Sequence, residues 1–184
     1  MISAIKILPH YTYDDWKDWE GNWELLEGIP FAMSPQPIPK HQRMAGLLFS
    51  IFNKALKKTT CRQCRVYTPI DWKINSDTVV APDVLIVYGE IKKKFLDFTP
   101  SLLVEILSPS TAIKDRNNKF IIYEKEGVKY YLIADIDKEK IEIFELVNGN
   151  YILLSEKKTY VINLENGCCI RVNPNKIWED QIPF

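Results

Sequence analysis

The sequence predicts an α/β fold in which helices flank a mixed β-sheet, and three observations support this prediction. Apolar residues recur at three- and four-residue spacing over residues 41–58, which is typical of an amphipathic helix. Residues 101–135 pass from an apolar strand pattern through a helical pattern to a second strand. Asn148-Gly149 lies between two further strand-like segments and is a strong hairpin signal.

The elements before the amphipathic helix are predicted to be short. Residues 11–20 suit a short helix, and residues 22–33 suit an N-terminal β-hairpin that turns at Glu27-Gly28. The segment SPQPIPK, residues 34–40, is a proline-rich loop. The amphipathic helix then carries several lysines near its end, where positive charge complements the helix dipole.

The remainder of the chain is predicted to consist mainly of strands. A helix is expected from residue 111 to Gly127, because glycine readily adopts the conformation that ends helices. The C-terminal β-hairpin occupies residues 140–156, and a final short turn follows within residues 174–184. The other strands are expected over residues 65–74, 78–88, 101–107 and 128–135.

Composition indicates one globular domain over residues 1–184, since 46% of the residues are hydrophobic and 26% are charged. Lys+Arg and Asp+Glu both number 24, so the protein lacks the global basic field of a nucleic-acid coat and would need a local patch for such contacts. No apolar run is long enough to cross a bilayer, and the start of the chain lacks the pattern of a secretory signal. We therefore expect a cytoplasmic protein.

The four cysteines do not form a complete zinc motif. Cys61 and Cys64 have the C-x-x-C spacing of half a zinc site, but the adjacent pair Cys168 and Cys169 is a poor second half. No histidine pair at finger spacing follows either. We expect four reduced thiols, and a zinc-bound interaction domain using Cys61 and Cys64 is the alternative.

Two carboxylates lie inside segments that otherwise look like buried strands. Asp83 lies in VVAPDVLIVY and Glu105 in LLVEIL, and an ionised carboxylate removed from water needs a counter-charge, a proton or a metal. If the two strands pair, the carboxylates come close together and a divalent cation is a natural counter-charge. Oxygen ligands of this kind favour Mg²⁺ or Mn²⁺.

The helix after the Glu105 strand offers a lysine to the same site. Asp115, Lys119 and Tyr123 are spaced at i, i+4 and i+8, so they share one helix face and Lys119 can point back over the sheet. A lysine beside a metal-bound water can orient or deprotonate it, or stabilise charge on a phosphate.

Each candidate also has an ordinary structural explanation. Asp83 could simply start a strand, and Glu105 could be a buried acid bonded to a tyrosine or paired with an arginine. Lys119 could be a solvated helix lysine. Asp115 could pair with Arg116 or with Lys119, and so orient the lysine.

Two further features have open roles. His41 could donate a proton or contact substrate, or it could only hydrogen-bond the backbone at the start of its helix. The run Lys92-Lys93-Lys94 suits a solvated loop, with contact to DNA as the alternative.

An ordered set of short motifs resembles a known family. Pro82-Asp83, then Glu105, then a nearby lysine resembles the PD-(D/E)XK nuclease superfamily. More narrowly, the segment from about Tyr13 to Asp135 is similar to the Uma-two family of restriction-endonuclease-like proteins. The motifs that carry this similarity, in order, are NWELLEG, the later His41, APDV, VEILSPST, KDRNNK and GVKYYLIAD.

The resemblance implies a restriction-endonuclease-like fold and a metal-dependent nuclease site. Asp83, Glu105 and the Ile106 carbonyl would hold Mg²⁺ or Mn²⁺. Leu107 stands where the superfamily motif has its lysine, and the resemblance implies that Lys119 on the following helix replaces it. The first acid of the site would be Glu24, with Glu27 the weaker candidate; the remaining accessory residues would be His41, Asp115 and Tyr123.

The leading hypothesis is therefore an endonuclease that hydrolyses phosphodiester bonds, with DNA as its nucleic acid. Many nucleases of this superfamily pair to cut two strands, which favours a homodimer. The alternative is a non-catalytic nucleic-acid-binding or regulatory module that keeps the fold, because the net charge is zero and the lysine is displaced.

Overall fold

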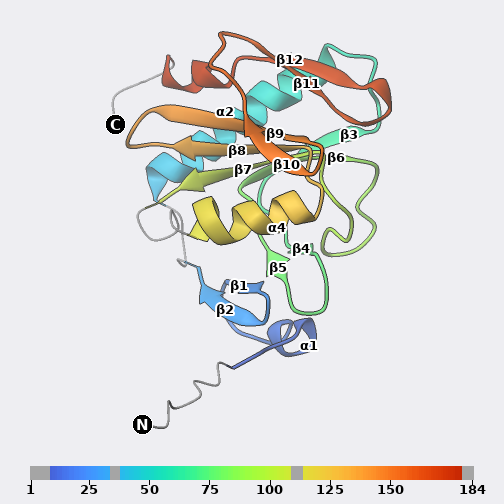
Figure 1. Cartoon of the computed structure of the whole chain (residues 1–184), viewed down its shortest axis with the longest axis vertical. Helices are drawn as coiled ribbons and strands as arrows, with labels where there is room; N and C mark the ends of the chain where they lie inside the picture. Colours follow the sequence, from blue (N-terminus) through green and yellow to red (C-terminus); the bar gives the residue numbers. More distant parts are fainter. Residues whose placement is uncertain (1–8, 34–37, 109–113, 180–184) are drawn as a thin grey trace.

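The computed structural model describes residues 9–33, 38–108 and 114–179, and its centre is a six-stranded mixed sheet (Figure 1). The two central strands are parallel, and every other neighbouring pair is antiparallel. This architecture confirms the predicted mixed α/β class. In spatial order the strands are β10 (Asn150–Leu153), β9 (Lys140–Val147), β8 (Tyr130–Asp135), β7 (Leu102–Leu107), β6 (Val84–Tyr88) and β3 (Cys64–Tyr67).

A helical crossover joins the two parallel strands. It consists of a π-helical turn, η1 (Asp115–Lys119), followed by α4 (Phe120–Lys125). The chain leaves this helix through Gly127 with φ of +76°, the left-handed conformation predicted for that glycine. Residues 109–113, where the sequence predicts the start of this helix, lie outside the described residues.

The predicted N-terminal hairpin, β1 (Trp23–Leu26) and β2 (Ile29–Ala32), is confirmed and belongs to a second sheet. This four-stranded sheet has the order β2-β1-β5-β4, where β4 is Trp72–Lys73 and β5 is Val79–Val80. It lies below the large sheet in Figure 1, with the short helix α1 (Tyr13–Trp16) at its far side.

Two single strands that the sequence predicts are each divided between the two sheets. Residues 65–74 form β3 in the large sheet and β4 in the small one, and residues 78–88 form β5 and then β6. Pro69 and Pro82 lie at the two breaks, and proline cannot donate a ladder hydrogen bond. The segment of residues 81–83 therefore carries the chain from one sheet to the other.

Both faces of the large sheet are covered, so alternate residues of its strands point into different cores. The amphipathic helix α2 (Pro39–Lys57) packs on one face with a small sheet formed by β11 (Tyr160–Asn163) and β12 (Cys169–Val172). On the other face α4 and the four-stranded sheet enclose the second core. Leu103 and Leu107 belong to this second core, so Glu105 between them points to the α4 side.

The remaining elements are short. The strands β11 and β12 are not predicted from the sequence, and the 3₁₀ turn η2 (Glu165–Gly167) joins them. A second 3₁₀ turn, η3 (Pro174–Trp178), agrees with the predicted final turn. In the C-terminal hairpin, Asn148 and Gly149 both have positive φ, 52° and 82°, as a tight hairpin turn requires.

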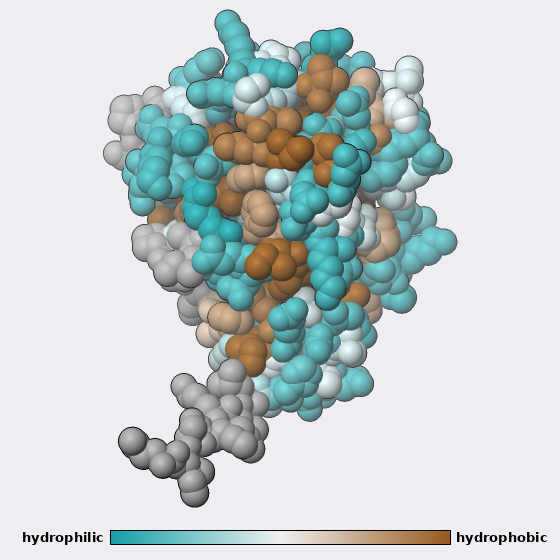
Figure 2. All heavy atoms as spheres, viewed as in Figure 1, coloured by the Kyte–Doolittle hydropathy of each residue, from teal (hydrophilic) through white to brown (hydrophobic). Residues whose placement is uncertain are grey.

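Hydrophilic side chains cover most of the face in Figure 2, with hydrophobic patches between them. Exposed apolar side chains on α4 and the β9–β10 hairpin include Ile121, Ile152 and Leu153. Within the described ranges, none of the helices combines the length and the apolarity needed to cross a bilayer.

The expectation of four reduced thiols is wrong. Cys61 and Cys168 form a disulfide across 107 residues of sequence, while Cys64 and Cys169 are free. The bond joins the connection between α2 and β3 to the start of β12. Spacing along the chain could not reveal this pair, because it depends on where the unpredicted β11–β12 sheet packs.

Reduction of this disulfide is expected to lower the free energy of unfolding by about 2–4 kcal/mol, because a long closed loop restricts the unfolded chain. Urea unfolding with and without a reductant, in the presence of a chelator, measures the difference. Cys169→Ser should respond as the unaltered protein does, whereas Cys168→Ser should not respond. Equal unfolding midpoints in both conditions for the unaltered protein would contradict the expectation.

Candidate active site

Glu105 lies in the middle of β7 and is almost fully buried, at 3% exposure. Its carboxylate accepts a hydrogen bond from the Tyr123 hydroxyl at 2.7 Å and from the Lys119 ammonium at 3.0 Å. Glu105 therefore bonds to a tyrosine, as its ordinary structural explanation expects, and also to the predicted helix lysine. Both partners come from the crossover that follows β7.

Lys119 lies at the centre of a buried group of carboxylates. Its Nζ lies 2.7 Å from Glu24, 3.0 Å from Glu105 and 3.4 Å from Asp115. All four side chains are at most 4% exposed. The explanation of Lys119 as a solvated lysine is wrong, because burial would be prohibitive for an ammonium without these partners.

Glu24 reaches the same group from β1 of the small sheet. One carboxylate oxygen accepts the Ala81 backbone N–H at 3.0 Å and contacts Lys119, and the other contacts Lys114. Glu24 is completely buried, at 0% exposure. The carboxylates therefore come from both sheets, and the lysines join them.

The π-helical turn explains how two lysines reach one acid. In an α-helix, residues five apart lie about 140° apart around the axis, whereas the i→i+5 bonding of a π turn stacks them. Lys114 precedes this turn and Lys119 ends it, and both contact Glu24. The local sequence predicts an ordinary helix here and does not indicate a π turn. Lys114 is therefore not among the site residues that the sequence predicts.

Asp83 lies beside Glu105, directly before the first residue of β6. Antiparallel pairing of Val84 with Val104 puts the preceding residue, Asp83, opposite Glu105. Asp83 N–H donates to the Val104 carbonyl at 3.2 Å, and its carboxylate accepts the Ile106 N–H at 2.7 Å. Because the N–H and C=O of one residue point the same way in a strand, the Ile106 carbonyl faces this side as well.

His41 closes the group from the first turn of α2. Its Nε2 lies 3.3 Å from the Asp83 carboxylate, and the two side chains are 13% and 14% exposed. Burial lowers the pKa of His41, but the hydrogen bond and charge of Asp83 outweigh it, so the pKa lies above its usual value. His41 therefore contacts a candidate ligand and is not only a backbone partner.

The site holds more negative than positive groups. Four carboxylates, from Glu24, Asp83, Glu105 and Asp115, face two lysines and one histidine. Burial raises the pKa of Glu105 well above its usual range; Lys119 opposes this, and the charges of Asp115, Asp83 and Glu24 add to it. Burial is the largest cause of this shift, and the neighbouring carboxylates add to it.

Glu24 and Lys119 both stay charged. Burial raises the pKa of Glu24, but Lys119 and Lys114 outweigh burial and the pKa is lowered. Burial lowers the pKa of Lys119, but Glu105, Glu24 and Asp115 outweigh it and the pKa lies well above its usual value. Lys119 is therefore an ammonium that orients its neighbours and not a free base.

Three further predictions concern residues outside the centre of the site or in supporting contacts. Glu27 is exposed in the β1–β2 turn with φ of 49°, so it does not belong to the carboxylate group. Asp115 contacts Lys119, as one alternative proposed, whereas Arg116 contacts Glu142 and Asp135. The run at residues 92–94 is an exposed loop, as predicted.

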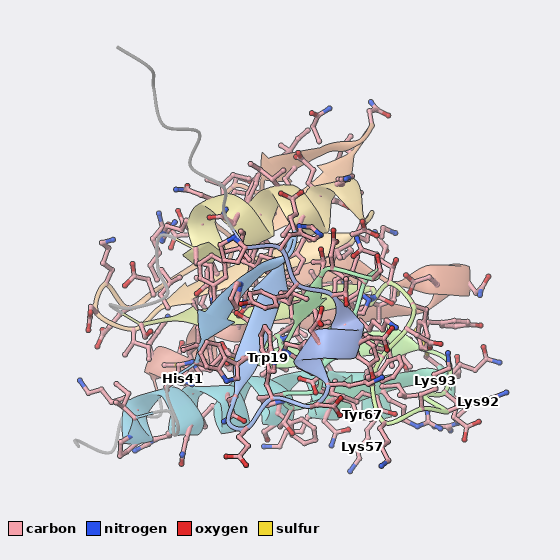
Figure 3. All side chains as sticks on the ribbon, turned by 90° about the horizontal axis from the view of Figure 1, so that it is seen from below. Trp19, His41, Lys57, Tyr67, Lys92 and Lys93 are labelled. Atoms are coloured by element: carbon pink, nitrogen blue, oxygen red, sulfur yellow. A yellow bond between two sulfur atoms is a disulfide. The ribbon has the colours of Figure 1, made fainter. Side chains whose placement is uncertain are left out.

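A cleft of about 560 Å³ leads to Asp83 from the N-terminal end of the molecule. The indoles of Trp16, Trp19 and Trp23 line it together with Lys94 and Asp71. Seen from below, Trp19 and Tyr67 lie between His41 on one side and Lys92 and Lys93 on the other, with Lys57 beside Tyr67 (Figure 3). Aromatic side chains and two lysines, Lys17 and Lys94, therefore line the cleft that leads to Asp83.

Lys119→Met is expected to lower the free energy of unfolding by about 3–5 kcal/mol, since it leaves three buried carboxyl groups without the cation that they share. Urea unfolding monitored by circular dichroism measures the loss. Lys125→Met, at the exposed end of α4, is the matched control and should change stability by less than about 0.5 kcal/mol. Equal effects of the two substitutions would show that the buried contacts contribute nothing.

Comparison with known proteins supports the fold. A crystal structure described as "a putative nuclease belonging to DUF820 from Anabaena variabilis ATCC 29413" matches with a TM-score of 0.66 and 19% identity. The match covers 80% of this chain and 86% of that one. At this identity the likeness shows a shared fold, that of a structure described as a nuclease.

Sequence relatives agree with this result. "Uncharacterized protein sll1609" from Synechocystis is 33% identical over 92 residues, which are 46% of this chain and 51% of that protein. The alignment thus spans about half the length of the relative. The Uma2 family model, described as "Putative restriction endonuclease", matches residues 11–167. Because this model covers most of the sequence, the chain belongs to the Uma2 family.

Proposed function

We propose that this protein is a metal-dependent endonuclease that hydrolyses phosphodiester bonds of DNA. The observation that carries the proposal is the position of Asp83, just before β6, opposite Glu105 of β7, within a group of buried carboxyl groups. Membership of a family described as restriction endonucleases agrees with it.

The residues present fit a Mg²⁺ or Mn²⁺ ion. Asp83, Glu105 and the Ile106 carbonyl supply oxygen ligands alone, which these hard cations prefer. The positive charge of a divalent ion would compensate the carboxylates that raise the pKa of Glu105. When bound, such an ion polarises a phosphoryl oxygen and lowers the pKa of a coordinated water.

The other residues of the site would orient the attacking water, stabilise negative charge or donate a proton. Lys119 keeps its proton, so its ammonium would orient the attacking water or stabilise negative charge on the phosphate. Glu24 and Asp115 hold that ammonium in place. His41, with its raised pKa and its contact to Asp83, could donate a proton from Nε2 to a departing oxygen.

The cleft beside Asp83 would receive the nucleic acid. Trp16, Trp19 and Trp23 line it, and bases stack on aromatic side chains, while Lys94 can contact phosphate. A local surface of this kind is compatible with zero net charge, because only the cleft needs to attract the substrate.

One observation favours the second candidate, a non-catalytic nucleic-acid-binding or regulatory module. The Lys119 ammonium already contacts Glu24, Glu105 and Asp115. An internal cation of this kind could replace a metal and serve stability alone. Measurements of cleavage and of metal binding distinguish the two candidates.

Glu105→Gln and Asp83→Asn are each expected to reduce Mn²⁺-dependent cleavage of plasmid and oligonucleotide DNA by at least about 100-fold. The reason is that metal stabilisation of the transition state is worth several kcal/mol. Glu145→Gln is the matched control, since Glu145 is also a strand glutamate that accepts a tyrosine hydroxyl, from Tyr130 at 2.6 Å. Full activity of Glu105→Gln, or equal loss in Glu145→Gln, would exclude the assigned roles.

Mn²⁺ is also expected to raise the unfolding temperature, because a ligand that binds only the folded state stabilises it by mass action. Glu105→Gln should lose this shift, and Glu145→Gln should retain it. Differential scanning calorimetry over a Mn²⁺ titration measures the effect without any substrate. A protein that shows neither a shift nor cleavage would instead be the non-catalytic module.

A further inference from the structure

Three cysteine sulfurs converge on the α2 side of the molecule. Cys61 lies between α2 and β3, Cys64 begins β3, and Cys168 directly precedes β12. Their Sγ atoms all lie within 4.8 Å of one another, and those of Cys64 and Cys168 are 3.5 Å apart. Within the described ranges, no other histidine, cysteine and acidic side chains bring three ligand atoms this close.

This group is separate from the carboxylate site. Cys64 pairs with Tyr88, the last residue of β6, whereas Asp83 precedes the first residue of the same strand. Five strand residues at about 3.3 Å each separate the two ends by roughly 16 Å. The cysteines therefore take no part in the proposed nuclease chemistry.

We propose that in the reduced protein Cys61, Cys64 and Cys168 bind one zinc ion. Cys61 and Cys64 have the C-x-x-C spacing of zinc sites, and the fold supplies Cys168 as the ligand that the sequence alone did not offer. Zn–S bonds of about 2.3 Å in a tetrahedral site place thiolate sulfurs roughly 3.8 Å apart. The separation of Cys64 and Cys168 is already close to this value.

The fourth coordination position would face solvent. A hollow of about 500 Å³ is lined by Cys61, Cys168 and Cys169 together with Thr59, Gln63, Tyr88 and Asn166 among others. Three protein ligands with one open position are the pattern of zinc sites that keep a bound water. The neighbouring Cys169 is exposed and does not belong to the group of three cysteines whose Sγ atoms converge.

The disulfide and the zinc site are alternative states of the same three sulfurs. A dithiol reductant transfers two electrons and two protons to the Cys61–Cys168 bond, and the reductant becomes a disulfide. Zinc then binds as the three thiols release their protons to solvent. Either state ties the α2–β3 connection to β12, so the packing of the β11–β12 sheet is retained.

The first experiment uses the unaltered protein. The protein is reduced with a phosphine and then freed of phosphine and metals. It is treated with an alkylating reagent, with and without one equivalent of zinc. Mass spectrometry then identifies the labelled cysteines. Zinc should slow labelling of Cys61, Cys64 and Cys168 by at least tenfold and leave the exposed Cys169 reactive. Unchanged labelling of the three cysteines would overturn the proposal.

The second experiment compares Cys64→Ser with the matched control Cys169→Ser. The reduced control should bind one zinc per chain by elemental analysis, and with Co²⁺ it should show the visible bands of tetrahedral thiolate coordination. Cys64→Ser should bind zinc at least tenfold more weakly while its circular dichroism stays native. Equal loss in both variants, or no zinc in either, would exclude the site. Neither outcome depends on nuclease activity.

Discussion

The Lys119 ammonium is the interaction on which the centre of this structure depends. Three carboxylates approach it from β1, from β7 and from its own helical turn. Burying any one of these carboxylates without a partner would be costly, so the group needs a cation at its centre. The small sheet, the large sheet and the crossover helix therefore meet at one nitrogen atom.

The arrangement also accounts for a departure from the superfamily pattern. Leu107 occupies the position where that pattern has lysine, and it packs into the core on the α4 side. The amine instead comes from the crossover, where the π turn directs Lys114 and Lys119 to the same acid. Charge at the site is preserved although the element that supplies it differs.

Much of the fold could be predicted from sequence because its signals are local. The amphipathic pattern of α2, the hairpin turn at Asn148-Gly149 and the apolar β7 each depend on neighbouring residues. The sheet change at residues 81–83 could not be predicted, since the apolar pattern continues on both sides of it. Pairing between distant strands decides which sheet each half joins.

In the candidate site, too, local signals could be predicted and contacts between distant residues could not. Asp83, Glu105 and Lys119 could be selected as unusual residues in regular elements, and the structure brings them together. Lys114 and the Ala81 N–H could not be selected, because their roles depend on the π turn and on the sheet change. The cysteine group likewise requires contact across 107 residues.

The passage of residues 81–83 between the sheets has a mechanical consequence. The Ala81 N–H donates a hydrogen bond to Glu24 in the small sheet. Two residues later, the Asp83 carboxylate accepts a hydrogen bond from the Ile106 N–H in the large sheet. A tether of three residues spans at most about 10 Å, so the small sheet and the large sheet cannot separate at this point.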